Sequence, residues 1–168
     1  SKFDHEIIVH INGEDNLTED YLLKKKLLYT KSKENIGLCS GVNLASKKST
    51  QNYIMYSHDD MFFCKNWDIY LENEIRQYPN NLYYLTGTNV SVKNGLINYD
   101  CGSSPINFDE LKFDNFCRND VSKDLQGSHW APHLIHKELW SKIGGFSEEY
   151  NPGDGSDPDL CMKLWKED

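Results

Sequence analysis

Tyr53-Ile-Met-Tyr56 is a strand-length run that is apolar at every position, and it leads directly into Ser57-His-Asp-Asp60. A strand without a polar face is typical of the interior of a parallel sheet that helices cover on both sides. Polar side chains that follow such a strand lie at its carboxyl end, where ligands bind in open α/β sheets. This stretch therefore predicts an α/β fold and the edge of the sheet at which a site is expected.

Strand and helix signals alternate on both sides of this stretch. The strand signals are β-branched or apolar runs bounded by turn residues, and they cover residues 6–11, 82–86 and 133–136. The helix signals are apolar residues at helical spacing, and they cover residues 18–29, 40–48, 67–75, 137–143 and the stretch from 158. Thr18, Asn66 and Asp157 are the predicted N-caps, and residues 98–124 read as an excursion over one face. Together these signals predict one domain over residues 1–168, with a mostly parallel central sheet and helices on both faces.

Composition and charge exclude several classes of function. The 168 residues carry 18 basic and 26 acidic side chains, a net charge of −8, which disfavours binding to nucleic acid. No apolar run approaches the roughly 20 residues of a membrane span. The five cysteines are scattered, odd in number and form no CxxC pair. This pattern predicts free thiols and a reducing, cytoplasmic location.

Asp59 and Asp60 stand side by side after the apolar strand, and two readings of them remain open. Adjacent carboxylates repel each other unless a cation lies beside them, and hard oxygen ligands suit Mg²⁺ or Mn²⁺. Such ions take the rest of their ligands from water and from substrate phosphates. The other reading is an acidic turn ahead of the helix that starts at residue 67, because aspartate is common in turns.

Five stretches, spread over nearly the whole chain, carry a family resemblance when they are taken together. Residues 6–13 read as a strand that ends in Asn-Gly, and residues 53–61 read as a strand that ends in His-Asp-Asp-Met. Residues 35–45 contain Asn-x-Gly and Asn-x-Ala, residues 140–146 end in Ile-Gly-Gly-Phe, and residues 156–160 read Ser-Asp-Pro-Asp-Leu. In their order along the chain, these stretches resemble the GT-A-fold (Rossmann-like) glycosyltransferases with a DxD-type acidic motif, particularly the inverting family 2. The resemblance begins at the family's second strand, so the family's first strand and helix are expected to be missing from these residues.

The resemblance implies a hexosyltransferase-type enzyme that moves a sugar from a nucleotide-sugar, expected to be a UDP-sugar, to an acceptor hydroxyl with inversion. Asp60, assisted by Asp59, would hold Mn²⁺ or Mg²⁺ against the diphosphate of the donor. Asn12 stands where the family has an aspartate pair and would contact the base. Lys33 or Lys31 would add a positive contact to the donor.

On the acceptor side, the resemblance implies that Asp157 is the catalytic base, with Asp159 as the alternative. The other reading of Asp157 is an N-cap, because it precedes Pro158. Trp130 and His129 would face the acceptor, which would be a carbohydrate, a protein or a lipid-linked molecule; alternatively, Trp130 packs in the core. Residues 150–156 read either as a mobile segment that folds over the donor or as an ordinary connection.

Other classes of function remain as alternatives. A non-catalytic or truncated sugar- or nucleotide-binding module of the same fold fits the same motifs. The dipeptide His58-Asp59 also suggests a metal-dependent phosphohydrolase, which would need further histidine ligands. The spacing of His129, His133 and His136 suits a zinc site on a helix, but Pro132 and a strand-like sequence argue against a shared face.

Overall fold

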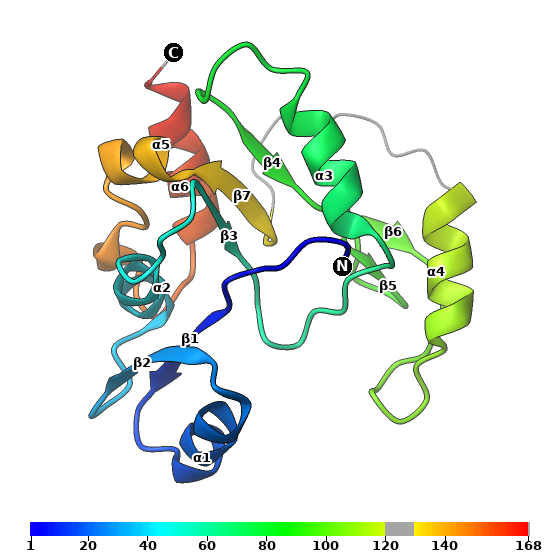
Figure 1. Cartoon of the computed structure of the whole chain (residues 1–168), viewed down its shortest axis with the longest axis horizontal. Coiled ribbons are helices and arrows are strands. Elements are labelled where there is room, and N and C mark those ends of the chain that lie inside the picture. The colour runs from blue at the N-terminus through cyan, green and yellow to red at the C-terminus, as the bar shows by residue number, and fades with distance from the viewer. Residues whose placement is uncertain (120–129, 168) are drawn as a thin grey trace.

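Strands and helices alternate along most of the chain (Figure 1). The computed structural model describes residues 1–119 and 130–167, and the architecture of this part is mixed α/β. The strands are β1 (Ile8–Asn12), β2 (Leu28–Ser32), β3 (Tyr53–Tyr56), β4 (Tyr84–Thr86), β5 (Val90–Ser91), β6 (Ile97–Asn98) and β7 (His133–His136). The helices are α1 (Asn16–Lys25), α2 (Leu38–Ser46), α3 (Trp67–Ile75), α4 (Glu110–Asn119), α5 (Lys137–Ile143) and α6 (Ser156–Trp165), with a 3-10 turn η1 (Glu148–Tyr150) before α6.

The N-terminal part of the chain forms a two-stranded parallel sheet. β1 pairs with β2 in a register that runs from Ile8 opposite Leu28 to Asn12 opposite Ser32. The strand predicted over residues 6–11 is confirmed as β1, shifted by about two residues at its start. Residues 28 and 29, predicted as the end of a helix, instead begin β2.

Helix α1 begins and ends earlier than its apolar spacing predicts. Its N-cap is Asp15, whose Oδ1 accepts a hydrogen bond from the Thr18 N–H at 3.0 Å, so Thr18 lies inside the first turn. The helix ends at Lys26, which adopts the left-handed conformation with φ of 56°. Glycine or asparagine is the usual residue there, so a lysine gives no signal that the helix stops.

The second sheet is antiparallel, in the order β3-β7-β4. β3 pairs with β7 from Tyr53 opposite His136 to Tyr56 opposite His133, and β4 lies on the other side of β7. The central strand is therefore β7, while β3 pairs on one side only within the described residues, and each of its residues is half-buried. This pairing differs from the mostly parallel central sheet that the sequence predicts. The apolar character of β3 reflects its packing against the core and not parallel neighbours on both sides.

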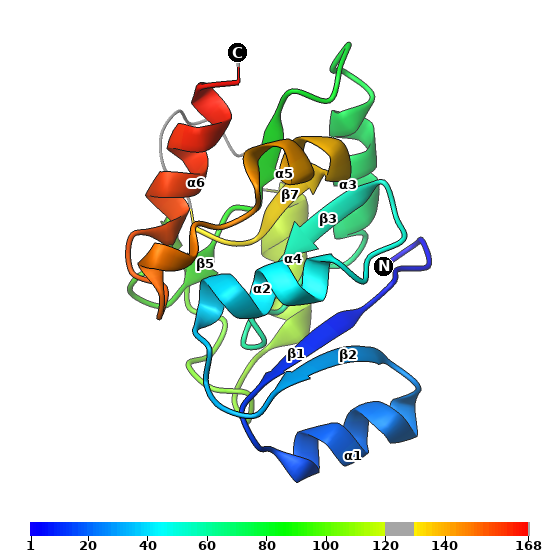
Figure 2. The ribbon, with the colours of Figure 1, turned by 90° about the vertical axis from the view of Figure 1, so that its left-hand side faces the viewer.

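Helix α2 connects the two sheets (Figures 1 and 2). On one side it packs against β1, where Gly41 faces the ring of His10. On the other side it contributes Cys39 to the main core, which α5, β7 and α6 complete. The buried members of this core are Cys39, Ile135, Leu139, Trp140, Ile143, Phe146, Leu160 and Leu164.

A residue far along the chain caps the N-terminus of α2. The residue at the N-cap position, Gly37, offers no side chain, and Asn151 takes its place. Asn151 Oδ1 accepts hydrogen bonds from the backbone N–H of Cys39 at 3.0 Å and of Ser40 at 3.4 Å, while its Nδ2 donates to Ser40 Oγ at 2.8 Å. The carbonyl of Pro152 accepts from the N–H of Leu38. Residues 150–156, one reading of which is a mobile segment, are thus joined to α2 at two consecutive positions.

The N-terminal segment ahead of β1 crosses to α3. Asp68, which is 4% exposed, accepts hydrogen bonds from the backbone N–H of Phe3 at 2.7 Å and of Lys2, and its Oδ2 lies 3.1 Å from His5 Nε2. The predicted start of α3 after Asn66 is confirmed, although the Asn66 side chain makes no capping hydrogen bond. These contacts hold the N-terminal residues against helix α3.

The segment predicted as an excursion contains β6 and α4 in its described part. Asp114 of α4 is buried and accepts a hydrogen bond from the N–H of Lys65 at 2.8 Å. The rings of Phe62, Phe108 and Phe113 contact one another beside it. α4 is therefore held against the chain that runs from the end of β3 to α3.

None of the helices within residues 1–119 and 130–167 has both the length and the apolar character needed to cross a membrane. Cys39, Cys64, Cys101, Cys117 and Cys161 are free thiols.

Candidate functional site

A pocket of about 310 Å³ opens where β3 ends and α6 begins. Its walls come from the end of β3, the first residue of α2 and the loop ahead of α6. The lining residues are Leu38, Tyr56, His58, Pro152, Gly153, Asp154, Ser156 and Asp157. The sequence predicts a site at the end of this strand, and Tyr56 and His58 from that strand end line the pocket together with the loop before α6.

Asp157 contributes a partly exposed carboxylate to this pocket. Helix α6 begins at Ser156, and its N-cap is Gly155 with φ of 83°, so the prediction that Asp157 caps a helix starting at Pro158 is wrong. The Asp157 side chain lies in the first turn, where a negative charge is favourable, and its Oδ1 is 2.9 Å from His133 Nε2. Asp157 is 19% exposed, so part of the carboxylate faces the pocket.

The hydroxyl of Tyr56 is surrounded by charged and polar side chains of the site. Its hydroxyl is 3.0 Å from His58 Nε2, and its ring packs edge-on against Phe146 at 5.3 Å between centroids. Burial raises the pKa of Tyr56, and the negative charges of Asp157, Asp60 and Asp59 raise it further. All three carboxylates therefore act on the pKa of one hydroxyl, and they make the electrostatic potential at the pocket negative.

Asp59 and Asp60 occupy an exposed turn directly after β3. Within residues 1–119 and 130–167, no set of three or more His, Cys, Asp or Glu side chains converges as metal ligands. A protein cage that encloses an ion does not fit this arrangement. Mg²⁺ and Mn²⁺ take most of their ligands from water and substrate phosphate, so two adjacent carboxylates are a chemically suitable ligand set for either ion. Of the described residues, the pocket lining includes His58 and neither of the two aspartates that follow it.

The predicted donor-binding residues of the first sheet lie elsewhere. Asn12 Oδ1 accepts from the N–H of Ile36 at 2.7 Å, and its Nδ2 donates to the carbonyl of Gly37 at 3.3 Å, so both ends of the amide hold the turn before α2. Lys31 pairs with Glu19 of α1. Lys33 is exposed at the end of β2, and in the described part of the chain the pocket lining includes neither lysine nor Asn12.

The three remaining residues predicted on the acceptor side are Asp159, Trp130 and His129, and their environments differ. Asp159 Oδ2 accepts from Ser147 Oγ at 2.5 Å, so this carboxylate is bound to the residue that follows the Gly-Gly-Phe segment. Trp130 is 64% exposed, so it is not a core residue. His129 lies outside the described residues.

The histidines of β7 do not converge as the zinc hypothesis requires. His133 points to Asp157, whereas His136 Nδ1 accepts from the N–H of Glu138 at 3.3 Å, at the start of α5. In a strand, residues three apart face opposite sides of the sheet. Sequence reasoning missed the contact of His133 with Asp157; the available signal was a histidine that begins a strand whose next two residues are apolar.

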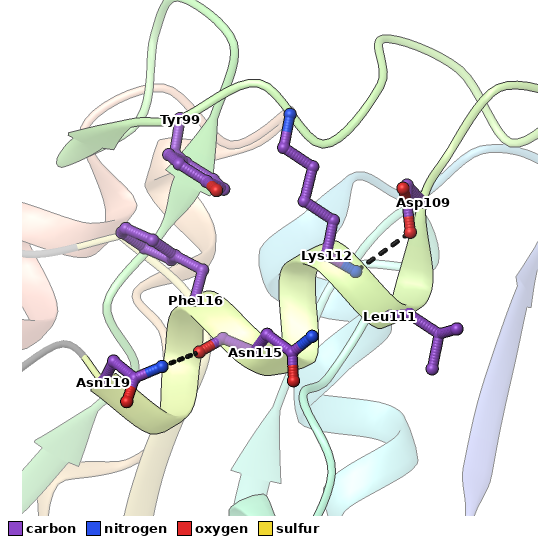
Figure 3. A pocket seen from close by; sticks show the side chains of 7 residues that line it. All are labelled: Tyr99, Asp109, Leu111, Lys112, Asn115, Phe116 and Asn119. Carbon is purple, nitrogen blue, oxygen red and sulfur yellow. Dashed lines mark hydrogen bonds between the residues drawn. The ribbon is translucent and has the colours of Figure 1, made fainter.

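A second and larger pocket, of about 630 Å³, lies along α4 (Figure 3). Among its lining residues, Tyr99 has an aromatic ring on which a ligand could stack. Phe116 stacks on that ring at 4.0 Å, and Lys112 Nζ lies 5.2 Å from its centre, so the ring is already engaged. The pocket at the end of β3 combines carboxylates, a histidine and a tyrosine, and it is the better candidate for chemistry.

A scan against protein-family models finds no match to the chain, and a comparison with curated proteins finds none either.

Proposed function

We propose that this protein is a metal-dependent, inverting glycosyltransferase that uses a nucleotide-sugar donor, with a GT-A-like, Rossmann-like variant of the mixed α/β fold. The observation that carries the proposal is that Asp157, Tyr56 and His58 line one pocket, with Asp59 and Asp60 in the turn that follows His58. The order of the motifs along the chain is the second support. Both supports come from this chain alone.

In this proposal the carboxylates have separate roles. Asp59 and Asp60 hold the ion beside the donor diphosphate, and Mn²⁺ or Mg²⁺ when bound supplies positive charge to the departing nucleoside diphosphate. Asp157 accepts the proton of the acceptor hydroxyl through the carboxylate oxygen that does not contact His133. The acidic pocket by itself repels a diphosphate, so donor binding depends on the ion.

Calorimetric titration with UDP, with and without Mn²⁺, tests the donor site. We expect binding only with Mn²⁺, and a loss of affinity of about tenfold or more in Asp60→Asn, because a neutral amide is a weaker ligand for a hard cation. Asp20→Asn is the matched control, since it makes the same change at an exposed position on α1. Tight binding without metal, or no binding of UDP at all, contradicts the proposal.

Release of UDP from a panel of UDP-sugars, with water as the acceptor, tests the chemistry. We expect Asp157→Asn to bind UDP and Mn²⁺ as the unaltered protein does and to cleave the donor at least about 100-fold more slowly. Binding without cleavage in the unaltered protein indicates a non-catalytic module of the same fold. Cleavage of the donor between its two phosphates, to UMP and a sugar phosphate, indicates a phosphohydrolase.

A further inference from the structure

His133 is a buried histidine with one engaged nitrogen and one nitrogen without a partner. Its side chain is 0% exposed, and Nε2 lies 2.9 Å from Asp157 Oδ1. Within the described residues, Nδ1 is buried and has no hydrogen-bond partner. Two tyrosine rings flank the imidazole, Tyr56 at 6.2 Å and Tyr84 at 5.9 Å between centroids.

This asymmetry determines which nitrogen carries the proton. An ionised carboxylate can only accept, so Nε2 is the donor to Asp157 and Nδ1 is the bare nitrogen of a neutral ring. A proton on Nδ1 would create a buried N–H without an acceptor among the described residues, which costs roughly 1–3 kcal/mol. A ring with its proton on Nε2 therefore leaves no buried N–H of His133 unpaired among the described residues.

The same hydrogen bond determines how Asp157 meets the pocket. Because Oδ1 is held by a ring fixed inside β7, the carboxylate cannot rotate freely, and Oδ2 is the oxygen left for the pocket. The backbone at Asp157 is in turn fixed by the first turn of α6. A base held in one orientation reaches its proton more often than one that rotates, and small displacements of such groups can lower rates by about 100-fold.

We propose that His133 is a positioning residue that holds the Asp157 carboxylate with Oδ2 toward the acceptor hydroxyl. The inference rests on the proposed function, because it assumes that Asp157 is the base. His133 neither touches the substrate nor takes its proton. As the acceptor oxygen forms its bond to the anomeric carbon and the bond from that carbon to the diphosphate breaks, the hydroxyl proton moves to Asp157 Oδ2. The hydrogen bond from Nε2–H to Oδ1 stays in place.

The test compares three substitutions at residue 133 in metal-dependent cleavage of a UDP-sugar. In His133→Gln the side-chain amide extends to the position of Nε2 and can restore the donor. In His133→Asn the amide reaches only the position of Nδ1, and His133→Leu removes the donor. We expect kcat to fall about 10- to 100-fold in the Asn and Leu variants and to stay within about threefold in the Gln variant. The KM for the donor stays within about twofold in all three, because His133 does not contact it.

His136→Gln is the matched control, since it changes a histidine of the same strand whose side chain faces away from Asp157, and its kcat is expected to be unchanged. A folded His133→Leu with kcat within twofold of the unaltered protein overturns the inference. If His133→Leu does not fold, the Gln and Asn variants decide, and equal kcat values in these two overturn it.

Nitrogen-15 spectra of the imidazole rings add a readout that does not depend on catalysis. We expect His133 in the unaltered protein to be neutral with its proton on Nε2, and this proton to exchange faster in Asp157→Ala. A proton on Nδ1 overturns the inference. Absence of metal-dependent cleavage by the unaltered protein overturns the proposed function and with it the role of Asp157, whereas cleavage that survives His133→Leu overturns the role of His133 alone.

Discussion

The side-chain amide of Asn43 and the backbone of Phe146 form a reciprocal pair of buried hydrogen bonds. Asn43 Nδ2 donates to the carbonyl of Phe146 at 2.8 Å, and the N–H of Phe146 donates to Asn43 Oδ1 at 2.9 Å. Gly145 permits this approach, because a Cβ there would lie 2.4 Å from Asn43 Oδ1. The two stretches that contain these residues both carried the family resemblance, and here their contact joins α2 to the turn after α5, beside the pocket.

Replacing Asn43 by leucine is expected to destabilise the protein strongly. Leucine is similar in size, but it leaves the buried N–H and carbonyl of Phe146 without partners, at a cost of about 2–4 kcal/mol in the free energy of unfolding. Urea denaturation measures the change. Asn73→Leu, at an exposed position on α3, is the control and is expected to stay within about 0.5 kcal/mol. Similar losses in both variants would mean that the Asn43 contact contributes little.

Gly41→Ala is expected to lower stability, although alanine is the better helix former. A Cβ at Gly41 would lie 2.7 Å from His10 Cδ2, and the His10 ring is held by a 2.8 Å hydrogen bond between Nδ1 and Thr30 Oγ1. Overpacking of this kind costs about 1–3 kcal/mol, more than the roughly 1 kcal/mol gained in helix propensity. Thermal unfolding of Gly41→Ala, His10→Ala and the double variant checks this. In the His10→Ala background the Gly41 substitution should become neutral or stabilising, and a gain in Tm from Gly41→Ala alone contradicts the prediction.

The same substitution, tryptophan to phenylalanine, is expected to lower stability much more at Trp140 than at Trp130. Trp140 is 5% exposed, donates from Nε1 to Ser46 Oγ at 3.1 Å and packs edge-on against Phe146. Trp140→Phe should cost about 1–3 kcal/mol, since it leaves a cavity and removes the hydrogen bond from Nε1 to Ser46 Oγ. Trp130→Phe should cost less than about 0.5 kcal/mol. It should also lower the share of the fluorescence that iodide quenches, while Trp165, which is 55% exposed, remains quenchable. A large stability loss at Trp130 would place it in the core after all.

Acidification is expected to weaken the contact between the N-terminal segment and α3. Burial alone would raise the pKa of Asp68, but the N–H groups of Phe3 and Lys2 together with His5 outweigh it and lower the pKa to about 2, from an ordinary value of 3.8. Because the pKa is lower in the folded state, the stabilisation is fully present above the unfolded value and is lost as pH falls from about 4 toward 2.

Urea denaturation across this pH range measures the effect. The unaltered protein should lose up to about 2 kcal/mol relative to Asp68→Asn between pH 5 and pH 2, as a shift of this size implies. Asp20→Asn, with its exposed carboxylate, should follow the unaltered protein. Parallel curves for Asp68→Asn and the unaltered protein would show that the contact does not depend on the carboxylate charge.

Local signals predict much of this fold. The runs at β1 and β7 and the apolar spacing of α3 and α5 are each contained within a few consecutive residues, so the sequence alone reveals them. The end of α1 is not revealed, because Lys26 adopts a conformation that its side chain does not favour. The antiparallel pairing of β3 with β7 was also beyond reach, since it depends on which distant segments meet and not on the composition of either strand.

The site divides in the same way. A strand end followed by acidic residues led to His58, Asp59 and Asp60, because that argument needs only one segment. The contact between Asp157 and His133 joins residues 24 positions apart. No pattern of residue spacing predicts a contact over that separation. The resemblance implies that Asn12 contacts the base, because it stands where the family has an aspartate pair, but its amide is occupied by the backbone of the neighbouring turn.

The cap that Asn151 places on α2 makes the loop beside the pocket and the first turn of that helix a single cooperative unit. If residues 150–156 move outward, the N–H groups of Cys39 and Ser40 lose their acceptor and become open to solvent. Hydrogen exchange at these two amides therefore reports each opening of the loop that carries Asp154, from a position more than 100 residues away in the chain. A ligand that closes the pocket would slow the exchange of both amides together.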